Sequence, residues 1–437
     1  MAKQADQNNS ARTAVLVEGG RIPFQRSGTG YQDMMAYDLG RMVIEGMLAK
    51  STISADQLDR VIMGCVIQDI NTSNVAREAA LGAGVPNAVP AHTVTMACIS
   101  SNQAATSAVE MIRSGQADII LAGGVETISD IPIRLKKDVR QKLLEARKYK
   151  KPTDWLKFFK GLSPSDILPE IPAIAEYSTG ETMGESCDKM AARFGISREA
   201  QDAYALRSHQ SAYKATVDGL LDEELLPASV PPDFDLIEQD NTYREDTSMK
   251  KLEKLNPAFV KPHGTITAGN SSAFTDGASA SLIMSEEKAD QLDITPKAYV
   301  RDYTYVAQNP EDELLLGPAY ATPQVLDMAG LQLDDIDVFE FHEAFAGQIL
   351  TVLKALDSDK FAKENLARDS KVGEIPMDKF NLWGGSLSLG HPFGATGTRL
   401  LTTAAHRLKH EDGKLALVAA CAAGGQGHAI ILERYNP

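Results

Sequence analysis

The 437-residue chain is too long for one ordinary hydrophobic core, so two or three domains are expected. Hydrophobic residues make up 43% and charged residues 24%, a balance typical of a soluble globular protein, which excludes a chain that is disordered as a whole. The formal net charge of -15 opposes general nucleic-acid binding, so no nucleic-acid partner is expected.

The first part of the chain alternates short apolar strands with amphipathic helices. Strands are predicted at 14–17, 60–66 and 118–121, and helices near 35–47 and 74–81. A Gly-rich turn is expected after the first of these strands, and the third is expected to end at Ala122-Gly123-Gly124. This alternation predicts βαβ units in a sheet rich in parallel strands.

One cysteine stands between a strand and a helix. Cys98 follows the apolar run 89–94 and precedes Ala105, Ala108, Val109 and Ile112, which recur with helical spacing. The unpaired N–H groups and the dipole of a helix N-terminus favour a thiolate, which predicts a nucleophile. The alternative is a small buried hydrophobic residue, as most free cysteines are.

The four cysteines and the chain ends bear on location and on metal binding. Cys65, Cys98, Cys187 and Cys421 lie far apart and form no CxxC pair, so neither a disulfide framework nor a metal site is expected. Residues 1–13 are polar, and no window resembles a membrane span. A reducing, cytoplasmic location of the bacterial type, without a targeting segment, is predicted.

The chain also contains an internal repeat. Residues 53–64 resemble residues 331–342, and the strand leading to Ala122-Gly123-Gly124 resembles residues 415–425. Two similar α/β halves are therefore predicted, with strand ends of both facing a shared crevice. We place the N-terminal half at 1–128 plus 256–292, an insertion domain at 129–255 and the C-terminal half at 293–437.

The insertion begins with a basic stretch. Residues 134–160 carry eleven Lys/Arg against three Asp/Glu, with Trp155, Phe158 and Phe159 interleaved. Such a stretch can dock on a membrane surface or a partner, can hold the phosphates of an anionic substrate, or can be a solvated helical face.

Three motifs besides Cys98 follow predicted strands. They are His342-Glu343-Ala344-Phe345 after the strand 338–341, the box Gly390-His391-Pro392-Phe393-Gly394, and Cys421-Ala422-Ala423-Gly424-Gly425-Gln426-Gly427 after the strand 415–419. A histidine of this kind can deprotonate a thiol, and the glycines let the backbone approach a ligand.

Together with Cys98, these motifs closely resemble the thiolase family over nearly the whole chain. Within it, His342 in place of the usual asparagine, Ala422-Ala423 and the basic insertion resemble the 3-ketoacyl-CoA thiolases that are β-subunits of fatty-acid oxidation trifunctional complexes. The resemblance implies a layered α-β-α-β-α fold with a mainly helical insertion (loop) domain. It also implies thiolytic cleavage of a medium- to long-chain 3-ketoacyl-CoA in fatty-acid β-oxidation.

The resemblance further implies a role for each residue. Cys98 would be the nucleophile, deprotonated by His391, and Cys421 the acid/base. One oxyanion hole would use His391 and a water held by His342, and the other the backbone N–H groups of Cys98 and Ala423. CoA would be a co-substrate rather than a bound cofactor. The residues expected to contact it are Met183, Thr267, Ala268, Gly269 and Phe345.

The implied partners are a second copy of the chain and an enoyl-CoA hydratase/3-hydroxyacyl-CoA dehydrogenase α-subunit, in an α2β2-type complex, with peripheral membrane association as an addition. Three other functions are alternatives. A decarboxylating ketosynthase would use a cysteine and two histidines, but Cys421 has no task in that reaction. The second alternative is a biosynthetic acetoacetyl-CoA thiolase. The third is a catalytically silent lipid-binding or scaffold protein, which release of acetyl-CoA from a 3-ketoacyl-CoA would exclude.

Overall fold

The computed structural model describes residues 12–170 and 175–436. In its first half the strands are β1 (Ala14–Arg21), β2 (Gln25–Arg26), β3 (Arg60–Gly64), β4 (Ala91–Val94), β5 (Ile119–Glu126) and β10 (Thr275–Ser285). The helices are α1 (Ala36–Lys50), α2 (Val75–Gly82), α3 (Ser100–Arg113) and α9 (Glu286–Gln291).

The second half contains β11 (Ala298–Ala307), β12 (Val338–Phe341), β13 (Leu415–Ala422) and β14 (Gln426–Arg434). Its helices are α10 (Pro310–Glu313), α11 (Gly317–Ala329), α12 (Ala346–Leu356), α13 (Asp359–Asn365), α14 (Ser386–Leu389) and α15 (Thr396–His410). Between the halves lie β6 (Arg134–Leu135), α4 (Lys137–Ala146), α5 (Trp155–Phe159), β7 (Pro169–Glu170), α6 (Met183–Arg193), α7 (Arg198–Val217), β8 (Ala228–Val230), β9 (Asp235–Ile237) and α8 (Met249–Leu252).

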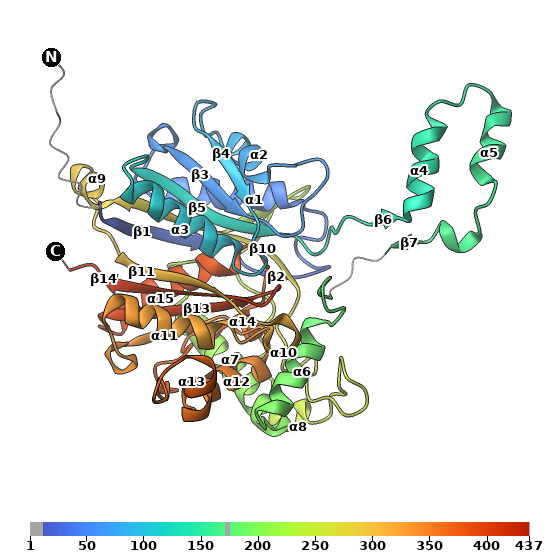
Figure 1. Cartoon of the computed structure of the whole chain (residues 1–437). Coiled ribbons are helices and arrows are strands. Elements are labelled where there is room, and N and C mark those ends of the chain that lie inside the picture. Colours follow the sequence, from blue (N-terminus) through green and yellow to red (C-terminus); the bar gives the residue numbers. More distant parts are fainter. Residues whose placement is uncertain (1–11, 171–174, 437) are drawn as a thin grey trace, which may run out of the picture.

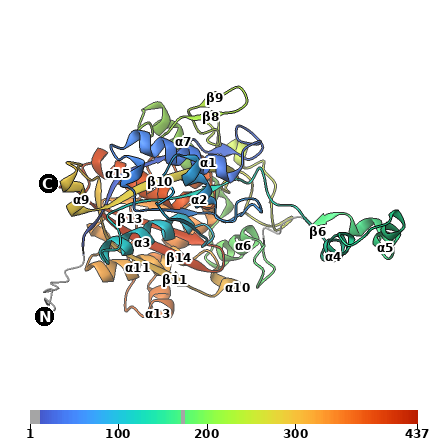
Figure 2. The same cartoon turned by 90° about the horizontal axis from the view of Figure 1, so that it is seen from above.

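The strands form a mixed sheet in the order β12-β13-β14-β11-β1-β10-β5-β3-β4. The two halves of the sheet join at β1 and β11 through only two residue pairs. Helices α1 and α2 cover the outer face of the first half, α11 and α12 cover that of the second, and α3 and α15 pack together between them (Figures 1 and 2). The predicted α-β-α-β-α layering is confirmed.

The same hydrogen-bonding pattern occurs in both halves, where an aspartate before a strand accepts two backbone N–H groups of the neighbouring strand. The Asp59 carboxylate, just before β3, accepts the backbone N–H groups of Asp118 and Ile119 at 2.7 and 2.9 Å. Asp337, just before β12, accepts those of Lys414 and Leu415 at 2.7 and 3.1 Å. Each aspartate thereby fixes the register of a parallel pair, β3 with β5 and β12 with β13, as a duplication requires.

Two strand boundaries and the strand directions differ from the sequence-based expectation. β1 continues through the predicted turn to Arg21, and β5 continues through Gly123 and Gly124 to Glu126. These glycines serve close packing: a Cβ on Gly124 would lie 1.9 Å from the carbonyl oxygen of Gly394. The prediction of a parallel-rich sheet is wrong, because β1, β10, β11 and β14 pair antiparallel with their neighbours.

The segment between the halves has two parts. The arm, residues 133–170, extends away from the body as a helical hairpin of α4 and α5 (Figures 1 and 2). It has a small core of its own in which Val139, Ala146 and Phe158 are buried. The rest returns to the body, where α6 and α7 pack against α12. The boundaries 1–128 plus 256–292, 129–255 and 293–437 stay a prediction.

Among the described residues, no helix combines the length and the apolarity needed to cross a bilayer.

The contact between α3 and α15 depends on one glycine. A Cβ on Gly397 would lie 2.1 Å from Asn102 Oδ1 and 2.6 Å from the Asn102 backbone nitrogen, and that nitrogen cannot move away without shifting α3. We expect Gly397→Ala to lower the free energy of unfolding by about 3 kcal/mol, measured by urea denaturation.

Gly40→Ala is the matched control, because Gly40 is also a buried helical glycine, but its new Cβ would meet only side-chain atoms, with the Ala79 methyl group at 3.2 Å and Val125 at 3.7 Å. We expect this variant to stay within about 1 kcal/mol of the parent. Equal effects of the two substitutions would contradict the proposed importance of the α3–α15 contact.

Candidate active site

Cys98, His342, His391 and Cys421 all line one cavity of about 930 Å³. Cys98 comes from the first half, in the turn after β4, and the other three come from the second half. His342 follows β12 and Cys421 lies at the end of β13, as expected, but the box that contains His391 joins α14 to α15, so the expectation that it follows a strand is wrong. The crevice expected from the sequence therefore brings all four predicted side chains together.

Cys98 lies in a tight turn between β4 and α3. Ala97, the residue before it, has φ of 47°, a left-handed conformation that costs energy for a residue with a Cβ. The Ser100 hydroxyl holds this turn, because its Oγ accepts from the Met96 N–H at 2.7 Å and donates to the Ala97 carbonyl at 2.7 Å. The turn leaves Cys98 half-buried and facing the cavity.

His391 is held by the loop between α14 and α15. Gly390 has φ of 95°, and a Cβ there would lie 2.4 Å from the Thr275 side chain, so both conformation and space demand glycine. The buried Glu126 carboxylate, at the end of β5, accepts the Gly394 N–H at 2.9 Å and the Ile67 N–H at 2.8 Å. Glu126 thus connects the His391 loop to the first half, a role that sequence reasoning missed.

Glu343 anchors the His342 loop. Its carboxylate accepts hydrogen bonds from Tyr204 Oη at 2.7 Å, Ser208 Oγ at 2.8 Å and Asn381 Nδ2 at 2.8 Å, and it also accepts the Leu387 N–H. All these groups are buried around a carboxylate that does not line the cavity. Glu343 therefore positions its neighbour His342 and ties α7 and α14 to it.

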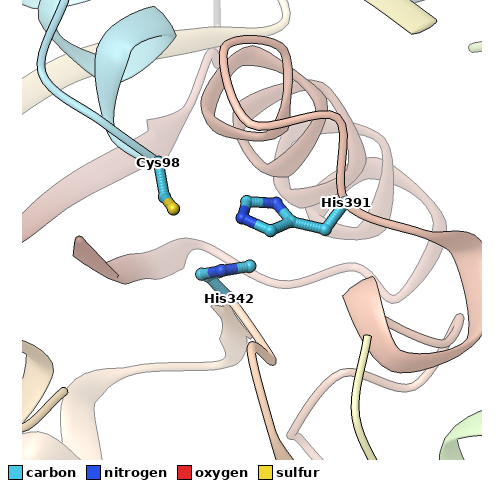
Figure 3. Close-up of side chains that lie close together, drawn as sticks. All are labelled: Cys98, His342 and His391. Carbon is cyan, nitrogen blue, oxygen red and sulfur yellow. The ribbon is translucent and has the colours of Figure 1, made fainter. Parts of the chain in front are cut away.

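Figure 3 shows the Cys98 sulfur facing the imidazoles of His342 and His391. One ligand atom from each of the three lies within 4.8 Å of the others, and the two ring centroids are 4.1 Å apart. A Cys/His/His set of this size could also hold a metal ion. The expectation of no metal site stays a prediction.

Cys421 is the penultimate residue of β13, directly before a tight hairpin. Gly424 and Gly425 have φ of 84° and 67°, so the glycines of the Cys-x-x-Gly-Gly box make the turn into β14. The hairpin also brings the backbone N–H of Ala423 to the Cys98 sulfur, beside the N–H of Cys98 itself. These two donors are the pair expected for one oxyanion hole.

Burial keeps the cavity groups uncharged. It raises the pKa of Cys98 to about 12, although the N–H groups of Ala423 and Cys98 oppose the rise, and it also raises the pKa of Cys421. Burial and the Arg399 charge lower the pKa of His391 to about 3. Burial thus opposes the thiolate that the helix N-terminus is expected to favour at Cys98, because desolvation disfavours the charged form of the thiol.

Of the residues predicted to contact CoA, four line the cavity: Met183, Ala268, Gly269 and Phe345. Thr267 is fully buried behind the wall, where its hydroxyl accepts the Gly269 N–H at 3.2 Å. Sequence reasoning missed three basic residues of the lining, Arg26, Arg244 and Lys251. They are scattered along the chain, so no local pattern marks them, whereas the conspicuous residues 134–160 contribute nothing to the lining.

Comparison with known proteins identifies the family. Residues 14–287 match the family described as thiolase, N-terminal domain, and residues 294–434 match thiolase, C-terminal domain. The chain belongs to the thiolase family.

The relatives of this thiolase include the mitochondrial trifunctional enzyme subunit beta of Bos taurus, which is 57% identical over 97% of this chain and 89% of its own length. A probable 3-ketoacyl-CoA thiolase of Caenorhabditis elegans is 53% identical, covering 97% of this chain and 94% of its own. The crystal structure of human mitochondrial 3-ketoacyl-CoA thiolase in complex with CoA superimposes with a TM-score of 0.84 at 30% identity, covering 97% of this chain and 98% of that one.

The raised pKa of Cys98 predicts how its reactivity depends on pH. Because the thiolate fraction rises tenfold per pH unit below the pKa, we expect alkylation of Cys98 by iodoacetamide to keep accelerating up to pH 10. No inflection from an imidazole is expected between pH 5 and pH 8. Mass spectrometry of the Cys98 peptide measures the rate.

The Cys98→Ser variant gives the background from the other three cysteines, and a free cysteine, whose rate levels off near its pKa of about 8.5, gives the reference profile. A Cys98 rate that is already constant between pH 6 and pH 8 would instead reveal a thiolate–imidazolium pair.

Proposed function

We propose that this protein cleaves 3-ketoacyl-CoA with CoA, giving acetyl-CoA and an acyl-CoA shortened by two carbons, in fatty-acid β-oxidation. The observation that carries the proposal is the convergence of two cysteines and two histidines on one cavity. The identity to relatives named 3-ketoacyl-CoA thiolase supports it.

In the first half-reaction the Cys98 sulfur attacks the 3-keto carbon while His391 takes the thiol proton. The C2–C3 bond then breaks, leaving an acyl thioester on Cys98 and a carbanion at C2 of acetyl-CoA. The Cys421 thiol donates the proton that makes acetyl-CoA. In the second half, the Cys421 thiolate takes the proton of incoming CoA, whose thiolate attacks the thioester. Cys98 leaves as a thiolate and recovers its proton from His391.

The neutral side chains of the cavity suit this series of reaction steps. Charge separates only when the oxyanions form, so fixed donors stabilise the transition states more than the resting state. The backbone N–H groups of Cys98 and Ala423 serve the thioester carbonyl. His391 and a water held by His342 serve the other oxyanion.

CoA itself is proposed to enter along the lining that includes Met183, Ala268, Gly269 and Phe345. Arg26, Arg244 and Lys251 supply positive charge for its phosphates. Because the residues 134–160 lie outside the lining, the phosphate-binding interpretation of the basic stretch loses its support. Cys421 likewise disfavours a ketosynthase, since decarboxylative condensation gives this second cavity thiol no task.

We also propose a homodimer bound to an enoyl-CoA hydratase/3-hydroxyacyl-CoA dehydrogenase α-subunit, in the cytoplasm. Relatives named trifunctional enzyme subunit beta support the complex. For the dimer, the half-buried strand β4 at a sheet edge offers a surface for a second copy.

The arm is proposed to bind an anionic membrane surface. Its Trp155, Leu156 and Phe159 side chains are 47%, 73% and 59% exposed although they are large and apolar. The stretch 134–160, which contains them, carries eleven basic residues, so insertion of the apolar side chains and attraction to anionic lipid would both favour binding.

Acyl labelling can distinguish the roles of Cys98 and Cys421. We expect Cys98→Ser to abolish thiolysis, because an alkoxide is far harder to generate than a thiolate. Cys421→Ala should still take an acyl group on Cys98 from an acyl-CoA but turn over slowly, as seen by mass spectrometry of the labelled peptide. An acyl group on Cys421 in the parent enzyme would reverse the assignment.

The arm hypothesis is tested with Lys148 and Lys151, which are exposed in the connection between α4 and α5 and form no ion pair with other described residues. We expect changing both to glutamate to weaken sedimentation with phosphatidylserine-containing vesicles about tenfold or more, at roughly 1 kcal/mol per charge near the surface. Thiolysis of acetoacetyl-CoA should not change.

The matched control reverses Lys360 and Lys363, an exposed pair with the same spacing on α13, and should bind vesicles like the parent. If both double variants bind equally, or if binding is insensitive to salt, the arm is not the membrane-binding element.

A further inference from the structure

A chain of buried hydrogen bonds lies behind His342. Its ring Nδ1 is 2.8 Å from Ser386 Oγ, and Arg399 Nη2 donates to the same Oγ at 2.9 Å. All three residues are buried completely. They come from the loop after β12, the start of α14 and the first turns of α15, so the chain of bonds is set by tertiary packing.

Counting protons assigns the direction of each bond. An arginine can only donate, so Ser386 Oγ is an acceptor toward Arg399. The single hydroxyl proton of Ser386 has one remaining partner among the described residues, His342 Nδ1. If Nδ1 were the donor instead, the buried Ser386 proton would have no acceptor, which costs free energy. Nδ1 therefore accepts, and the ring proton is on Nε2.

We propose that Ser386 and Arg399 are positioning residues that lock His342 in the neutral Nε2–H tautomer, so that it donates a hydrogen bond to an oxygen acceptor in the cavity. The inference deepens the proposed function, because that acceptor is the water or carbonyl oxygen of the proposed oxyanion hole. His342 Nε2 has no partner among the described protein atoms, so its proton is free for such an acceptor.

The charges around the ring agree with this assignment. Arg399 stands behind the Nδ1 side, and its nearest carboxylate, Glu340, is 3.9 Å away and bonded to Arg407 at 2.7 Å. A cation there opposes a second proton on His342. Burial, the neighbouring His391 and Arg399 together lower the pKa of His342.

His391 has the opposite arrangement. Its Nδ1 is 2.6 Å from Thr396 Oγ1, and the Thr396 hydroxyl is placed to donate to the Pro392 carbonyl at 3.1 Å. Both contacts are satisfied when Nδ1 donates to Thr396, which leaves a lone pair on Nε2. The two imidazoles, whose ring centroids are 4.1 Å apart, thus have different roles. His342 donates a hydrogen bond through its Nε2–H, and His391 accepts a proton at Nε2 as a base.

A double-mutant cycle on acetoacetyl-CoA thiolysis tests the coupling. We expect Ser386→Ala to lower kcat about a hundredfold, the loss typical of one oxyanion donor. In a His342→Asn background the same change should cost less than about threefold, because an amide always carries N–H donors and needs no tautomer to be set. Equal losses in both backgrounds overturn the proposal.

Ser388→Ala is the matched control. Ser388 is a buried serine on the same short helix, but its hydroxyl contacts Ser208 and Gly385 rather than His342. We expect it to keep kcat within about threefold of the parent. A loss equal to that of Ser386→Ala would mean that the effect is only structural.

The tautomer can also be read without turnover, by nitrogen NMR of protein with 15N-labelled histidine, with His342 assigned from its absence in His342→Asn. A pyridine-type Nδ1 with a pyrrole-type Nε2 supports the proposal, and the reverse overturns it. This measurement stands if Ser386→Ala fails to fold. It also separates the two hypotheses, since a protein without thiolase activity can still show the predicted tautomer.

Discussion

The active-site geometry depends on the close contact between the two central helices. α3 follows the nucleophile turn of the first half, and α15 follows the His391 loop of the second half. Gly397 lets these helix starts approach so closely that a Cβ there would overlap Asn102, and Gly124 lets β5 approach the Gly394 carbonyl in the same way. Both contacts involve backbone atoms, which cannot move without moving the helix or loop that carries them. A small shift of either half would therefore separate Cys98 from His391.

Desolvation dominates the electrostatics of the cavity. It raises the pKa of Cys98 and lowers the pKa values of both histidines, so the resting site is a set of neutral groups. The donors around it are fixed by backbone or by buried side chains and need no rearrangement when charge develops. A thiolate held permanently by a cation would lower the energy of the resting state as well, and would reduce the gain in rate.

Buried charges hold the scaffold around this neutral site. Arg21 forms ion pairs with Glu224 at 2.7 Å and with Asp240 at 2.6 Å, linking β1 to the segment that follows α7. Arg407 pairs with Glu340 at 2.7 Å behind the His342 loop. Removal of one partner would leave an uncompensated buried charge, which is strongly destabilising. These pairs therefore fix where the loops lie rather than taking part in the chemistry.

The sequence by itself determined the family, the layered fold and the four side chains that meet in the cavity, because short local patterns mark them. The strand 338–341 and the box that begins at His342 were found in this way. The run through Gly123 and Gly124 was misread as a strand end, because only their packing against β10 and Gly394 explains them. The protonation state of Cys98, the tautomer of His342 and the basic lining residues Arg26, Arg244 and Lys251 were decided only by the tertiary structure. Each depends on burial or on partners that are distant along the chain, and no local pattern of residues records those.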